Sequence, residues 1–221
     1  MRTAMVRADN AAAQAREDIR AGGHTGPTSG MAPGYAQANL VVLPQEYALD
    51  FLRFSVRNPG PCPLLEVTDT GSPHPEVVAA GADLRTDVSR YRVFRDGECT
   101  DEPTDISQYW RADLVAFLLG CSFTFEWALA AAGLRLAHQD QGTNVPMFVT
   151  DRRCVDAGPF RGPLVVSMRP FTPTDVGRVA EISARFPAMH GAPVHVGDPA
   201  ALGITDLAAP DFGDPVSIGV D

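Results

Sequence analysis

The stretch Asp113-Leu-Val-Ala-Phe-Leu-Leu-Gly120-Cys-Ser-Phe-Thr-Phe-Glu-Trp-Ala-Leu-Ala-Ala-Ala-Gly133 contains two apolar runs separated by a glycine and a short polar segment. We predict a helix over residues 113–119 and an interruption at Gly120. A second helix is expected over residues 123–132, capped by Ser122 and ended by Gly133. Gly120 therefore separates two apolar elements, and the residues directly after it begin a helix.

On either side of this stretch, helical patterns alternate with short apolar runs that are typical of strands. The expected helices cover residues 7–20, 44–56 and 174–186. The expected strands cover residues 39–43, 64–67, 135–138, 145–150, 164–168 and 193–196, and the Asp96-Gly97 pair predicts a hairpin over 91–99. This alternation predicts an α/β fold with a mixed sheet and flanking helices. A polar segment, Gln139-Asp-Gln-Gly-Thr143, predicts a boundary between residues 1–140, the main domain, and residues 141–221.

The overall composition disfavours several classes of partner. The formal net charge is −9, whereas nucleic acids and anionic membranes bind proteins through cationic surfaces. No stretch approaches the roughly 18 uninterrupted apolar residues of a membrane span, and the charged residues among positions 1–20 do not fit a signal peptide. The four cysteines are widely spaced and form no zinc-finger pattern. We therefore expect a cytoplasmic protein with reduced thiols, without nucleic acid, membrane or metal.

All 18 basic residues are arginines, so the chain contains no lysine. A lysine Schiff base, a lysine-anchored pyridoxal phosphate and a P-loop lysine are therefore excluded. Arginine remains, and its planar guanidinium suits the recognition of carboxylates.

Cys121 and Ser122 lie where the second predicted helix begins. The partial positive charge at a helix N-terminus would lower the pKa of the Cys121 thiol and would direct backbone N–H groups at an anion. In the alternative interpretation, Cys121 is a small buried apolar residue and Ser122 only caps the helix.

His190 and His195 form the only close pair of histidines, in His190-Gly-Ala-Pro-Val-His195-Val-Gly-Asp198. They are candidates for proton transfer or for hydrogen bonds to a substrate. A metal site fits this spacing less well, because it differs from the helical zinc motif. Alternatively, both rings bond backbone carbonyl groups of their own loop.

Four further residues are candidates for substrate binding. Arg169 ends an apolar strand just before a proline, and Arg57 opens a rigid loop, so either could reach a ligand at the edge of a sheet. Asn39 and Asn144 precede short apolar runs, where an amide either satisfies the backbone or contacts a ligand. Arg85 lies between two aspartates and is more typical of a structural ion pair.

Six ordered motifs resemble the bacterial hydro-lyase family of the D-glutamate cyclase type, and together they cover nearly the whole chain. They are Arg20-Ala-Gly-Gly-His-Thr-Gly-Pro-Thr-Ser-Gly30, Gly34-Tyr-Ala-Gln-Ala-Asn-Leu40, Arg57-Asn-Pro-Gly-Pro-Cys-Pro63, Gly120-Cys-Ser-Phe-Thr-Phe-Glu126, Val166-Ser-Met-Arg-Pro170 and His190-Gly-Ala-Pro-Val-His-Val-Gly-Asp-Pro199. The resemblance implies an α/β fold with a smaller α+β subdomain over residues 141–221. It also implies a lyase of amino-acid metabolism that forms 5-oxo-D-proline from D-glutamate with loss of water.

This reaction requires three kinds of group. Arg169, or else Arg57, would hold the α-carboxylate, and His190 or His195 would take a proton from the ammonium group. Ser122 and the N–H groups after Gly120 would stabilise the oxyanion, whereas Cys121 could instead form a thioester. No cofactor is required.

The expected partner is a small carboxylate or amino acid, and a homo-oligomer is left open. Two other functions stay open as well: a non-catalytic binding protein for a small carboxylate metabolite, and a thiol-dependent amidohydrolase. Members of the family continue with a Trp- and Cys-containing segment before a Thr-Pro, whereas this sequence stops at Asp221. The resemblance therefore predicts that the smaller subdomain is truncated.

Overall fold

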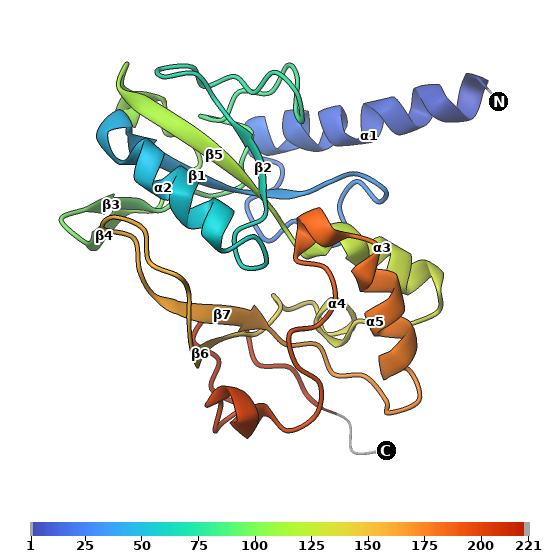
Figure 1. Cartoon of the computed structure of the whole chain (residues 1–221). Coiled ribbons are helices and arrows are strands. Elements are labelled where there is room, and N and C mark those ends of the chain that lie inside the picture. Colours follow the sequence, from blue (N-terminus) through green and yellow to red (C-terminus); the bar gives the residue numbers. More distant parts are fainter. Residues whose placement is uncertain (1, 219–221) are drawn as a thin grey trace.

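A three-stranded antiparallel sheet forms the centre of the upper part of the computed structural model, which describes residues 2–218 (Figure 1). Strand β5 (Leu114–Gly120) lies between β1 (Ala38–Pro44) and β2 (Leu64–Val67). All seven residues of β5 are buried. The helix predicted for residues 113–119 is therefore wrong.

Burial on both faces of β5 explains this error. Val115, Phe117 and Leu119 pack on one face against helix α2 (Gln45–Arg57), which brings Phe51 into the same cluster. Ala116 and Leu118 pack on the opposite face with Leu84. A strand covered on both sides has no polar alternation, so its apolar run cannot be distinguished from a buried helix by periodicity.

The lower part is built around the hairpin of β6 (Met147–Arg153) and β7 (Pro163–Ser167), which packs against the short helix η3 (Pro199–Leu202) through Phe148 and Leu202 (Figure 1). Helices α3 (Phe123–Ala131) and α5 (Val176–Ala184) lie side by side and share a cluster with Leu129 and Val179.

The remaining elements are α1 (Arg2–Arg20), the β3 (Val93–Arg95) and β4 (Glu98–Asp101) hairpin, η1 (Ser107–Tyr109), α4 (Ala137–Asp140) and η2 (Pro187–Met189).

The α/β expectation is confirmed, and the paired strands that the structure describes run antiparallel rather than in mixed directions. The Asp96-Gly97 turn is also confirmed, because both residues have a positive φ, as a two-residue hairpin turn of this kind requires. Two predicted strands are wrong: residues 137–140 form helix α4, and residues 193–196 form a loop. The boundary near residue 140 stays a prediction. Among the described residues, every helix is too short or too polar to cross a membrane.

Gly120 is the point where the end of β5 touches the segment that carries His190. A Cβ atom at Gly120 would collide with the backbone carbonyl oxygen of Ala188 and would lie 2.8 Å from the Sδ atom of Met189. Both belong to η2, directly before His190. The missing side chain therefore lets η2 lie against the sheet and places His190 beside the end of β5.

We predict that Gly120→Ala lowers the free energy of unfolding by about 1–3 kcal/mol, the usual cost of forcing an extra methyl group into a packed site. Gly162→Ala is the matched control, because its Cβ would meet no atom within 4 Å, and urea denaturation measures both. An unchanged stability of Gly120→Ala would contradict the close contact between β5 and η2.

Candidate functional site

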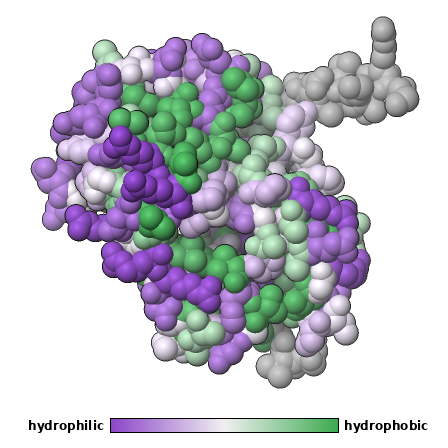
Figure 2. All heavy atoms as spheres, in the orientation of Figure 1, coloured by the Kyte–Doolittle hydropathy of each residue, from purple (hydrophilic) through white to green (hydrophobic). Residues whose placement is uncertain are grey.

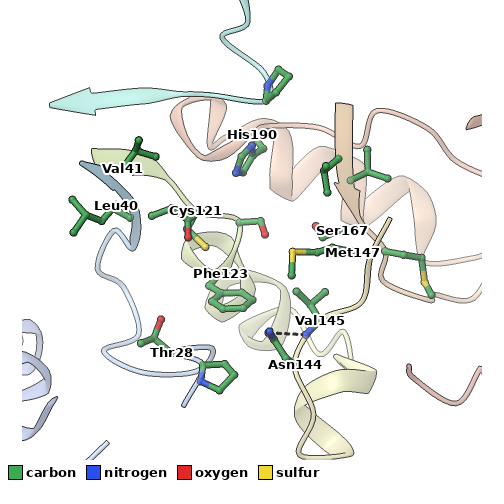
Figure 3. A pocket seen from close by; sticks show the side chains of 18 of the residues that line it. Thr28, Leu40, Val41, Cys121, Phe123, Asn144, Val145, Met147, Ser167 and His190 are labelled. Atoms are coloured by element: carbon green, nitrogen blue, oxygen red, sulfur yellow. Dashed lines mark hydrogen bonds between the residues drawn. The ribbon is translucent and has the colours of Figure 1, made fainter. Parts of the chain in front are cut away.

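A cavity of about 2240 Å³ opens between the β1–β5–β2 sheet and the β6–β7 hairpin. Figure 2 shows the molecule hollowed in this region, with apolar residues beside the hollow. In Figure 3, Cys121, Phe123 and His190 face the same space as Ser167 and Met147. The cavity is larger than the roughly 300–1,000 Å³ of a small-molecule pocket, so a small ligand would contact only part of its wall.

The structure brings seven of the eight predicted site residues to the wall of this cavity. They are Asn39, Cys121, Ser122, Asn144, Arg169, His190 and His195. The eighth, Arg57, does not line it. Its exposed side chain donates from Nη1 to the backbone oxygen of Asp156, 2.5 Å away, so it ties α2 to the segment after β6. Arg85 pairs with Asp83 at 2.7 Å, as its sequence context indicates.

Glu126 on α3 is the centre of a buried polar network beside the cavity. Its side chain is 1% exposed and accepts hydrogen bonds from four residues. Ser29 Oγ donates at 2.6 Å and Gln139 Nε2 at 2.9 Å, both to Oε2. His138 Nε2 lies 3.1 Å from Oε1, which also receives Nε and Nη2 of Arg169 at 3.0 and 2.5 Å. Glu126 thus connects the loop before β1, helix α4 and the end of β7.

These partners determine the charge of Glu126. Burial raises its pKa, but His138, Arg169 and Ser29 outweigh burial and lower the pKa to about 2. The carboxylate therefore stays ionised at neutral pH, and His138 donates its Nε2 proton to it, because a carboxylate can only accept.

The guanidinium group of Arg169 makes its hydrogen bonds to other side chains of the protein. The edge formed by Nε and Nη2 faces Glu126, and Phe125 lies against the guanidinium with its ring centroid 5.4 Å from Cζ. Nη2 also donates to Ser122 Oγ at 3.0 Å, and Nη1 donates to Ser167 Oγ at 2.9 Å. The bidentate edge expected to hold a substrate carboxylate is therefore bonded to Glu126.

The pKa of the Cys121 thiol differs from the sequence-based expectation. Burial raises the pKa of its thiol and outweighs the lowering by the Phe123 N–H, Arg169 and Asn39. The expected depression of this pKa is therefore wrong, because desolvation exceeds the effect of the helix terminus. The thiol is protonated at neutral pH.

The helix start also differs from expectation. Ser122 makes no capping hydrogen bond with its side chain, which instead accepts from Arg169. The N–H of Cys121, an expected oxyanion donor, is occupied by the backbone oxygen of Gln37 at 3.0 Å.

His190 is held by a hydrogen bond to the backbone. Its Nδ1 lies 2.9 Å from the backbone oxygen of Gly60, so Nδ1 carries the proton and Nε2 carries the lone pair when the ring is neutral. Burial lowers its pKa below the usual 6.5, and Arg169 lowers it further, whereas the backbone groups of Gly60 and Gly120 oppose this shift. His190 also has a positive φ of 76°, and such backbone conformations occur at functional sites.

The remaining three candidates have fewer contacts that indicate a role in the site. His195 Nε2 lies 2.7 Å from the backbone oxygen of Asp198, so its ring is bonded within its own loop. Asn144 Oδ1 accepts a hydrogen bond from the N–H of Val145 at 2.9 Å (Figure 3), and the residue lines the cavity. Asn39 is exposed on β1 and its side chain lies near the Cys121 thiol.

Sequence reasoning missed the network around Glu126, including Ser29, His138 and Ser167. A signal was present, because Glu126 is the only charged residue in the otherwise apolar run 113–133 after Asp113. A buried carboxylate needs a cation or several donors, and in a chain without lysine the permanent cation can only be an arginine. Among residues 2–218, no three His, Cys, Asp or Glu side chains form a group that could hold a metal ion.

Comparisons with known proteins bear on the same residues. A family model described as D-glutamate cyclase matches residues 115–221, from β5 onward. A protein of Rubrobacter xylanophilus is 71% identical over 208 residues, which are 94% of this chain and 80% of the relative. Relatives from Bradyrhizobium diazoefficiens and Streptomyces coelicolor are 55% and 60% identical, over 94% and 88% of this chain and 76% and 70% of their own. All three carry the name "putative hydro-lyase".

We predict that Glu126→Gln lowers the free energy of unfolding by about 3–5 kcal/mol at neutral pH, because it leaves Arg169 buried without a counter-ion. The pKa of Glu126 is lowered from 4.5 to about 2 in the folded protein. The stabilisation is therefore fully present above about pH 4.5 and is lost as the pH falls toward 2.

Urea denaturation between pH 2.5 and 7 measures this effect. The difference in the free energy of unfolding between the native protein and Glu126→Gln should become smaller as the pH falls. Glu181→Gln is the control, since Glu181 pairs with Arg185 on the exposed face of α5 and its replacement should change stability little. If this difference in the free energy of unfolding does not change with pH, the ionised Glu126 carboxylate does not stabilise the fold as stated.

Proposed function

Because this chain belongs to the hydro-lyase family of the D-glutamate cyclase type, we propose that it removes water from a small amino-acid carboxylate, with D-glutamate as substrate and 5-oxo-D-proline as product. The observation that carries this proposal is the shared cavity of His190, Ser122 and Arg169, three polar residues from three separate segments. A cytoplasmic location belongs to the same proposal.

The reaction closes a lactam ring. The amino nitrogen of D-glutamate forms a bond to the side-chain carboxyl carbon, and the bond from that carbon to one oxygen breaks. His190 Nε2 accepts a proton from the ammonium group before the nitrogen attacks and passes it to one oxygen of the side-chain carboxyl group. After the attack it takes a second proton from the nitrogen and passes it to the same oxygen, which departs as water.

The lowered pKa of His190 suits this role. A base must be unprotonated before it acts, and burial keeps His190 neutral at pH 7. The lone pair of the neutral ring lies on Nε2, because Nδ1 is bonded to the Gly60 carbonyl oxygen. His195 is the second candidate base and also lines the cavity.

Cys121 defines an alternative route. A thioester with the side-chain carboxyl carbon would split the reaction into two steps, and the same thiol would serve an amidohydrolase. Both routes need a thiolate, and the raised pKa of Cys121 disfavours one at neutral pH. The direct route through His190 is therefore the one that we propose.

We predict that His190→Gln lowers kcat/KM for D-glutamate by about 10²–10⁴-fold, the usual contribution of a general base. With the native protein, kcat/KM should fall on the acid side below pH 6.5, because protonated His190 cannot accept a proton, and this fall should disappear in the variant. Chiral chromatography of 5-oxo-D-proline measures the product, with L-glutamate as the stereochemical comparison.

Two further variants complete the experiment. His74→Gln is the control, since His74 also bonds a backbone oxygen, that of Ala82, but does not line the cavity. Cys121→Ala should keep activity within a few-fold under the direct route and should abolish it if a thioester forms. Binding of D-glutamate by the native protein without any product would instead support a non-catalytic binding protein.

A further inference from the structure

We propose that the hydroxyl groups of Ser122 and Ser167, both oriented by Arg169, form the subsite that binds the carboxylate of the substrate. This inference rests on the proposed function only for the premise that the substrate carries a carboxylate. Ser122, expected from the sequence as an oxyanion donor, and Ser167 become binding residues, and Arg169 becomes a positioning residue rather than a direct clamp.

The count of donors and acceptors leads to this assignment. A guanidinium group has only N–H donors, so Ser122 Oγ and Ser167 Oγ must both accept from Arg169, at 3.0 and 2.9 Å. Each hydroxyl then keeps its own proton to donate. Among the described residues, neither hydroxyl has an acceptor for that proton, and both side chains line the cavity.

Arg169 itself is poorly placed to leave its partners for a ligand. Its side chain is 9% exposed, Glu126 occupies its Nε–Nη2 edge and Phe125 lies against the guanidinium. Swinging the guanidinium out would leave Glu126 as a buried carboxylate without its cation, which is costly. The network therefore keeps Arg169 in place, and its hydrogen bonds orient the two serine hydroxyls so that their protons can be donated to a ligand.

The surroundings favour an anion at this position. Ser122 precedes α3, whose N-terminal end carries a partial positive charge. Ser167 is the last residue of β7, and Figure 3 shows it near Met147. Its hydroxyl lies close to that of Ser122, because both accept hydrogen bonds from the same guanidinium group. Two O–H donors match the two oxygens of a carboxylate, and hydrogen bonds to a charged acceptor are stronger than those to a neutral one.

The specificity follows from the same chemistry. A primary amide replaces one carboxylate oxygen by an NH₂ group, which has no lone pair to offer to a hydroxyl donor. The subsite should therefore prefer an acid over its amide.

Calorimetric titration with 5-oxo-D-proline, D-glutamate and the neutral 5-oxo-D-prolinamide tests the subsite without any need for turnover. Ser167→Ala and Ser122→Ala should each weaken binding of the two acids by 10-fold or more, the usual effect of losing a hydrogen bond to a charged group. Binding of the amide should change by less than 3-fold, so that the preference for the acid falls. Ser167→Thr keeps the hydroxyl and should restore most of the affinity.

Thr150→Val is the matched control. Thr150 lies in the same hairpin, but its hydroxyl already donates to the backbone oxygen of Leu164 at 2.8 Å. Its loss should lower stability and leave the preference for acids unchanged. In a turnover assay, Ser167→Ala should raise KM with a smaller effect on kcat.

Three results would overturn the subsite: unchanged acid binding by Ser167→Ala, equal weakening of acid and amide, or no binding of either acid by the native protein. The proposed function fails separately. If the native protein binds the acids through the serines but forms no 5-oxo-D-proline, the subsite is supported and the proposed reaction is contradicted. If Ser167→Ala cyclises D-glutamate with an unchanged KM, the proposed reaction is supported and the subsite is contradicted.

Discussion

The buried ion pair between Glu126 and Arg169 is the interaction on which the candidate site depends. Moving both charges out of water costs several kcal/mol per ion, and the structure offsets this cost with Ser29, His138 and Gln139 around the carboxylate and with Ser122 and Ser167 around the guanidinium. Segments far apart in the sequence are thereby fixed to one another. The arrangement places polar groups at the cavity wall whose positions are set before any ligand arrives, as binding and catalysis require.

Elements with one polar face were predictable from the sequence. Helix α2 and the Asp96-Gly97 turn follow from local pattern and backbone preference, and both are found. Strand β5 was not, because α2 and the cluster around Leu84 cover its two faces. A run such as Leu114–Leu119 contains no information about which partners will cover it, so its assignment depends on contacts distant in sequence.

The candidate site shows the same division. Chemical type and order along the chain indicated Cys121, Ser122, Arg169 and His190, and all four line one cavity. Their electrostatics could not be predicted, because desolvation depends on the folded surroundings. Burial raises the pKa of the Cys121 thiol and outweighs the effect of the helix terminus. The pairing of Arg169 with Glu126 likewise depends on a contact between distant segments. In a chain without lysine, arginine supplies every permanent side-chain positive charge, and Arg169 uses its charge to neutralise Glu126 inside the protein.

A crystal structure of the protein with bound 5-oxo-D-proline would test this account most directly. We expect each carboxylate oxygen to accept from a serine hydroxyl, one from Ser122 and one from Ser167, while the guanidinium of Arg169 stays on Glu126 and His190 Nε2 faces the ring. A guanidinium that has left Glu126 to bind the carboxylate itself, or a ligand seated away from the two serines, would contradict the claim that the buried pair prepares the site.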